Sequence, residues 1–200
     1  MITKRSSKFN DDKELWHDGR PVHVDRIFGG IGFPRFAVVL GEERFFGETH
    51  YFVLAETETE RNESMADLID SCRKLQAEYS VLRWFGRVDV NVKEILAICN
   101  RQLYSTGYRG VVVSDVPRIG EYIDQQMSTV HMLVRPSQKR LHFFNESMIQ
   151  SELFSLPTRD IKADEHHRAT ALANVVASML RYSGDDHQAS QAEPLPENWY

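Results

Sequence analysis

The sequence predicts an α/β domain built on a mixed sheet. Short runs rich in β-branched and aromatic residues fill the segment 21–56, and glycine and proline residues separate them. From Ser64 onward, apolar residues recur at helical spacing, and helical segments then alternate with short apolar runs. Antiparallel strands followed by alternating helices and strands indicate a mixed sheet flanked by helices.

The first part of this domain is predicted to be a meander of three strands. PVHVDRIF (21–28) alternates between apolar and polar residues, and RFAVVL (35–40) and HYFVLAE (50–56) are short apolar runs. GGIGFP, between the first two runs, is predicted to be a glycine-rich turn.

The rest of the domain is predicted to alternate between helices and strands. Met65, Leu68, Cys72 and Tyr79 lie at helical spacing, and Ser64 with Asp67 resembles a capping box. The later elements are a strand at 80–85, a helix over 92–103, a buried strand at 110–116, a short helix near 119–127, a strand at 140–144, a short helix at 146–154 and a final helix at 165–182. The RNase H-like fold has this order, and it is the fold class that we predict.

Composition divides the chain into three parts and argues against a membrane protein. Residues 1–20 form a polar arm, residues 21–182 the RNase H-like domain, and residues 183–200 an acidic tail. No apolar run approaches the roughly 20 residues that span a bilayer, so we expect a cytoplasmic protein with no membrane partner. Trp199 and Tyr200 predict that the end of the tail docks on the protein itself or on a neighbouring subunit. Docking on a neighbouring subunit would make a homo-oligomer.

Five segments together carry a family resemblance: GFPRFAVVLGEE, HYFVLAE, WFGRVD, KRLHFFNESMIQSELFSLP and DEHHRATALANVVASMLRY. They resemble the C-terminal nuclease domain of phage terminase large subunits, the DNA-packaging proteins of tailed phages. This resemblance covers roughly residues 22–182. It implies a metal-dependent DNA endonuclease, or a degenerate derivative of one, that acts in DNA packaging or processing. Double-stranded DNA and phage packaging or assembly proteins would be its partners.

The fold and the resemblance together imply a carboxylate site for two divalent cations about 4 Å apart. Asp25 lies on the first predicted strand, Asp89 follows the strand after the first helix, and Asp164 and Glu165 open the last helix. Their hard oxygen ligands suit Mg²⁺ or Mn²⁺. Each also has a competing structural role: Asp25 as a charge at a strand end, Asp89 as a helix N-cap, and Asp164 as an N-cap with Glu165 in the first turn.

The chain departs from the terminase pattern at two positions. The family's first aspartate lies in a Gly-x-Asp ahead of the strand matching FAVVL, whereas GGIGFP has no acid. Thr170 stands where the family has the aspartate of Asp-Ala-Leu. A second hypothesis is therefore a non-catalytic phage assembly or adaptor protein that uses the fold and the tail to bind other proteins.

Histidine and cysteine residues do not indicate a zinc site. Adjacent residues on a helix point about 100° apart, so His166 and His167 cannot both face one ion. Cys72 and Cys99 fall on apolar helix faces and are predicted to be buried, reduced thiols. His50, Glu56 and Glu58 are either further metal ligands or part of a solvated acidic edge.

A basic segment lies in the middle of this acidic chain. The net charge is −5, but residues 81–140 hold nine Lys or Arg against five acids, which leaves +4 in that segment and −9 elsewhere. A basic segment of this kind can face a polyanion or be neutralised by its own flanks. The residues predicted to contact the DNA backbone are Arg87, Arg135, Lys139 and Arg140.

Overall fold

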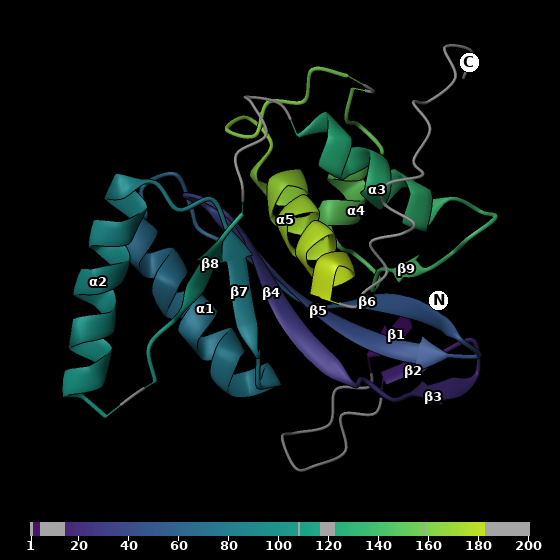
Figure 1. Cartoon of the computed structure of the whole chain (residues 1–200), viewed down its shortest axis with the longest axis horizontal. Helices are drawn as coiled ribbons and strands as arrows, with labels where there is room; N and C mark the ends of the chain where they lie inside the picture. The colour runs from purple at the N-terminus through teal and green to yellow at the C-terminus, as the bar shows by residue number, and fades with distance from the viewer. Residues whose placement is uncertain (1, 5–14, 108, 117–122, 158, 183–200) are drawn as a thin grey trace.

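The structure is a computed structural model that describes residues 2–4, 15–107, 109–116, 123–157 and 159–182 (Figure 1). Within these ranges the strands form a main sheet of six and a small sheet of three. The main sheet has the order β8 (Val113–Asp115), β7 (Arg83–Gly86), β4 (Arg26–Gly32), β5 (Phe36–Phe45), β6 (Glu48–Glu58) and β9 (Leu141–His142). The small sheet has the order β1 (Ile2–Lys4), β2 (Leu15–His17) and β3 (Arg20–Val22).

The directions of the strands confirm the predicted fold class. β4, β5 and β6 form an antiparallel meander. β7 then pairs parallel to β4, and β8 pairs parallel to β7. This mixed sheet, with helices flanking it, is the arrangement of the RNase H-like fold.

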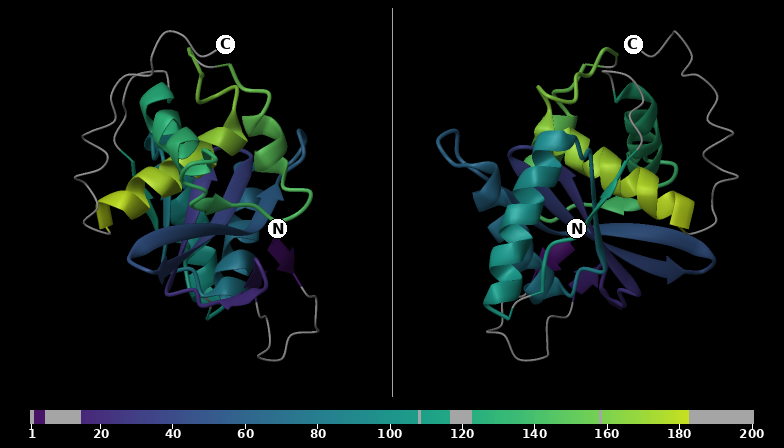
Figure 2. Two further views of the ribbon diagram at one scale, coloured as in Figure 1. Left: turned by 90° about the vertical axis from the view of Figure 1, so that its right-hand side faces the viewer. Right: turned by 60° about the vertical axis from the view of Figure 1, so that its left-hand side comes forward.

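Helices cover both faces of the main sheet (Figures 1 and 2). The helices are α1 (Met65–Tyr79), α2 (Val90–Ser105), α3 (Asp124–Val134), α4 (Met148–Leu153) and α5 (His167–Tyr182). On β5, Val38 and Leu40 pack with the core of α3, α4 and α5, while Ala37 and Val39 pack with that of α1 and α2. Successive strand residues point to opposite faces, so one strand supplies both cores. No described helix is long and apolar enough to cross a membrane.

The glycine-rich stretch is a strand and not the predicted turn. Gly29, Gly30 and Gly32 lie within β4, and the chain turns at Phe33–Arg35 instead. A Cβ at Gly29 would lie 2.1 Å from the Trp84 ring, and one at Gly30 would lie 2.1 Å from the carbonyl oxygen of Ala171. The glycines therefore allow β4 to lie against a tryptophan on one face and against the backbone of α5 on the other.

The ends of the helices confirm some capping predictions and correct others. The backbone N–H of Ser64 donates to Asp67 at 2.7 Å, as a capping box requires. The last helix begins at His167, two residues later than predicted, so Asp164 and Glu165 lie in the turn before it. Within the predicted N-terminal arm, residues 15–17 form β2; the acidic tail and its two aromatic residues lie outside the described residues.

Candidate functional site

The parallel strands of the main sheet end at one edge, where α5 begins. We call this the carboxyl edge; it is marked by Gly32 of β4, Gly86 of β7, Asp115 of β8 and His167 of α5. β6 runs in the same direction as β4, so Glu58 also lies at this edge. Since the RNase H-like fold carries its acids on the first strand, after the first helix and at a late helix, this is where a site is expected.

Asp89 and Asp115 lie at the carboxyl edge, where Asp89 follows β7 and Asp115 ends the neighbouring parallel strand β8. The Asp89 carboxylate accepts a hydrogen bond from the backbone N–H of Val92 at 2.8 Å and so caps α2. The Asp115 carboxylate accepts one from the backbone N–H of Val88 at 2.9 Å, which holds it beside the residue that precedes Asp89. Sequence reasoning missed Asp115; its signal is an acid directly after the apolar run GVVVS.

The turn before α5 brings further polar groups to the carboxyl edge. Asp164 and Glu165 are exposed there, and Glu165 pairs with Lys162 at 3.0 Å. Burial is the main cause that lowers the pKa of His167, which favours its neutral form. The Nδ1 atom of His167 is buried and has no hydrogen-bond partner among the described residues.

Asp25 lies at the opposite edge of the sheet from Asp89. It directly precedes β4, whose Ile31 is in register with Gly86 of β7. Six residues of extended chain separate Asp25 from Ile31, a span of about 20 Å. The Asp25 carboxylate accepts a hydrogen bond from the backbone N–H of Arg44 at 3.1 Å, at the far end of β5. The structure therefore does not bring Asp25 into one site with Asp89, Asp164 and Glu165.

The first-strand position at the carboxyl edge is occupied by the backbone of α5. A Cβ at Gly32 would lie 1.9 Å from the carbonyl oxygen of His167, and a Cβ at Gly30 would lie 2.1 Å from that of Ala171. No side chain fits at Gly30 or Gly32 while α5 stays in place. Among the described residues there is also no group of three His, Cys, Asp or Glu side chains that could hold a metal ion. The residues present do not fit the predicted two-metal site.

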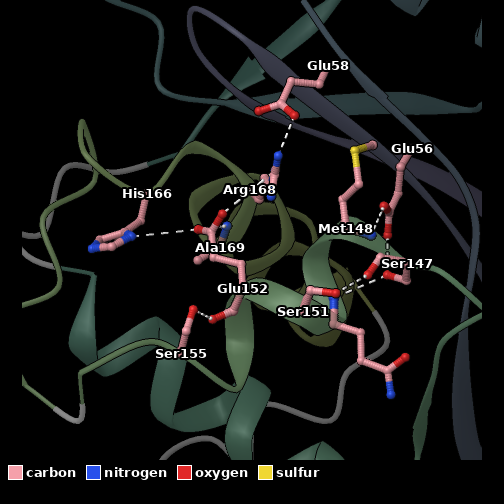
Figure 3. A network of polar contacts seen from close by, with 11 residues as sticks. Glu56, Glu58, Ser147, Met148, Ser151, Glu152, Ser155, His166, Arg168 and Ala169 are labelled. Atoms are coloured by element: carbon pink, nitrogen blue, oxygen red, sulfur yellow. Dashed lines mark hydrogen bonds and ion pairs between the residues drawn. The ribbon is translucent and has the colours of Figure 1, made fainter.

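A cationic side chain lies between carboxylates at the start of α5 (Figure 3). The Arg168 guanidinium donates to Glu58 at 2.5 Å, and its Nε lies 3.8 Å from a carboxylate oxygen of Glu152. The same Glu152 lies 3.7 Å from Nδ1 of His166. The hydrogen bond to Glu58 is the main cause that raises the pKa of Arg168. Arg168 thus supplies a fixed positive charge to acids that come from β6 and α4.

Glu56 organises the start of α4 beside this network (Figure 3). Its carboxylate accepts a short hydrogen bond from the Ser147 hydroxyl and one of 2.7 Å from the backbone N–H of Met148. Burial is the main cause that raises the pKa of Glu56. Its contacts are those of a helix-capping group, and we find no metal-ligand arrangement for it with Glu58 and His50 among the described residues.

The predicted DNA-contacting residues divide between two edges of the sheet. Arg87 follows β7 at the carboxyl edge and is half-buried. Arg135, Lys139 and Arg140 lie in the connection from α3 to β9, which reaches the start of β6 at the opposite edge. Arg140 is buried and donates from Nε to the carbonyl oxygen of Thr49 at 2.7 Å, so it holds two segments together and is not placed to meet a phosphate.

Three solved structures resemble this chain in the arrangement of their elements. They are the fowlpox virus Holliday junction resolvase (12% identity, TM-score 0.42, covering 78% of this chain and 99% of that one), the fowlpox virus resolvase with Holliday junction DNA (9%, 0.44, 78% and 98%) and Thermus thermophilus RuvC (12%, 0.41, 79% and 96%). No family model and no curated protein matches the chain.

Proposed function

We propose that this chain is a degenerate derivative of a phage-type nuclease, which binds double-stranded DNA without two-metal cleavage. It keeps the sheet and the helices that position a nuclease site in the RNase H-like fold. Phage packaging or assembly proteins are its proposed protein partners.

One observation carries the proposal, which is the close packing of α5 on Gly30 and Gly32. Two-metal cleavage needs a carboxylate that bridges or holds both cations at a common point. At the carboxyl edge the first strand can offer none, because the helix backbone already occupies the space of a side chain. Several acids near this edge already have other partners: Asp89 caps α2, and Glu58 and Glu152 face Arg168.

The DNA-binding part of the proposal rests on the basic residues near the carboxyl edge. Arg87 follows β7, and Lys93 is exposed in the first turn of α2, three residues after Val90 begins that helix. Arginine and lysine contact phosphates without reading sequence. We therefore expect binding that depends on salt concentration and is tolerant of DNA sequence.

The test is a titration of a labelled duplex, followed by fluorescence anisotropy at several salt concentrations. Each phosphate contact contributes about −0.9 to the slope of log K against log salt for duplex DNA. Arg87→Gln should reduce the size of the slope by about that amount. Lys139→Gln, at the opposite edge, is the matched control and should leave the slope unchanged.

Three results would contradict the proposal in different ways. A slope that responds to Lys139→Gln and not to Arg87→Gln would place DNA on the opposite edge, where Arg135 also lies. Absence of salt-dependent binding would remove DNA as the partner and favour the adaptor hypothesis. Cleavage with Mg²⁺ or Mn²⁺ that needs Asp89, Asp164 or Glu165 would restore the nuclease hypothesis.

A further inference from the structure

Three histidines from three different strands meet where the small sheet joins the main sheet. His17 lies on β2, His50 on β6 and His142 on β9, and we call them the histidine cluster. Nδ1 of His50 lies 3.0 Å from Nε2 of His142. The rings of His17 and His142 have centroids 4.1 Å apart, and Phe52 stacks on His142 at 4.7 Å.

The cluster is one of the contacts between the two sheets. Beside it, Val22 of β3 and the half-buried Leu15 of β2 pack in a small apolar group with Phe52 of β6. The ring of His17 also meets Phe52 edge-on, with centroids 5.6 Å apart. The small sheet is thus attached through the ring of His17, through this apolar group and through Arg20 of β3, which binds Glu43 of β5.

The contact between His50 and His142 requires that at least one of the two ring nitrogens carries a lone pair and accepts a hydrogen bond. A neutral imidazole has one N–H donor and one acceptor nitrogen, whereas a protonated one has two donors. If His50 and His142 were both protonated, two N–H groups would face each other across 3.0 Å. Burial is the main cause that lowers the pKa of all three residues, and it lowers the pKa of His142 to about 3.

The charged groups around the cluster do not compensate for protonation. Asp18 lies 3.4 Å from His17 and Glu48 lies 3.8 Å from His50, but both carboxylates are exposed and so are screened by water. Glu43 of β5 is bound by Arg20 of β3 through two hydrogen bonds of 2.7–2.8 Å. Arg20 and the buried Arg140 add positive charge near His50.

We propose that the histidine cluster is an acid-sensitive clamp, and that its protonation releases β2 and β3 from the main sheet. Opening takes His17 and part of the burial away from His142, so the pKa of His142 rises from about 3 towards its ordinary value of 6.5. The open state therefore takes up a proton at higher pH than the closed state does. Closure is fully favoured above pH 6.5 and weakens as the pH falls from 6.5 towards 3.

Hydrogen exchange of the full chain at pH 7 and pH 5, corrected for intrinsic rates, tests the clamp. If opening restored the whole pKa difference of His142, opening would become about 25-fold more favourable between these pH values, and this is the upper limit of the effect. Amides of residues 15–22 should lose protection at pH 5 by up to that factor, and amides of β4 should not. His142→Phe keeps an aromatic ring on Phe52 without a titrating group, so it should remove the part of the pH effect that comes from His142 and leave only what His17 and His50 contribute. His23→Gln, which replaces an exposed histidine, is the matched control and should keep it.

Carbon-detected NMR titration of the imidazoles in the wild-type chain gives an independent reading. The proposal is supported if the resonances of His142 show a neutral imidazole at pH 5 while the clamp is closed. A His142 midpoint near 6.5 in the closed state would overturn it. Equal protection of residues 15–22 at both pH values, or a pH effect of undiminished size in His142→Phe, would overturn it as well.

Discussion

Gly32→Ala tests whether α5 really fills the first-strand position. The new Cβ would lie 1.9 Å from the His167 carbonyl oxygen, whereas ordinary contacts lie at 3.4–4 Å, so at least one backbone must move by about 1.5 Å. Overpacking typically costs about 1–3 kcal/mol, and we expect about 3 kcal/mol here because the obstructing atom belongs to a helix backbone. Urea unfolding should show a lower midpoint with an unchanged m-value.

Gly86→Ala is the matched control for this substitution. Gly86 is a buried glycine of the neighbouring strand β7, and its added Cβ would have its nearest neighbours at 3.2 Å, which small shifts can accommodate. We expect a cost below about 1 kcal/mol for Gly86→Ala. If Gly32→Ala were as stable as Gly86→Ala, α5 would not be packed on β4 as described, and a side chain would fit there.

Three further predictions concern other named contacts. In thermal unfolding, Asp89→Ala should lower the free energy of unfolding by about 1 kcal/mol, because α2 loses its cap. Asp89→Asn can still cap the helix and should leave that free energy nearly unchanged. Arg168→Gln should lower the free energy of unfolding by about 1 kcal/mol, since its pairs with Glu58 and Glu152 are partly exposed. The control Lys162→Gln, which removes an exposed pair, should lower it by less than about 0.5 kcal/mol. Equal losses would mean that Arg168 does not neutralise the two acids. Cys72 is fully buried, and burial raises the pKa of its thiol. A thiol reagent should therefore leave Cys72 unmodified in the native protein and modify it in urea. Rapid labelling of Cys72 in the native protein would contradict its burial.

The fold could be predicted from sequence where local patterns agree with the tertiary structure. The helix from Met65 to Tyr79 shows both its apolar spacing and its capping box in the sequence, and the structure has both. GGIG was predicted to be a turn because glycine is common in turns. In the structure those glycines are required by Trp84 and by α5, which begins 135 residues after Gly32, and no local pattern contains that contact.

The candidate site was predictable only in its location. The order of elements correctly places Asp89 and the turn before α5 at one edge. The start of the first strand was placed too early, and this is why Asp25 was assigned to the site although it precedes β4. The pairing of Arg168 with Glu58 joins residues 110 positions apart, so the sequence offered no signal for it.

The most direct test of the account uses supercoiled plasmid DNA and wild-type protein with Mn²⁺ in one reaction. Gel electrophoresis before and after removal of the protein separates binding from cutting. We predict that the protein slows the migration of the plasmid in the gel at low salt. Once the protein is removed, the plasmid should be recovered in its supercoiled form. Nicked or linear plasmid that disappears with chelator and with Asp89→Asn would contradict the account and show an active metal-dependent endonuclease.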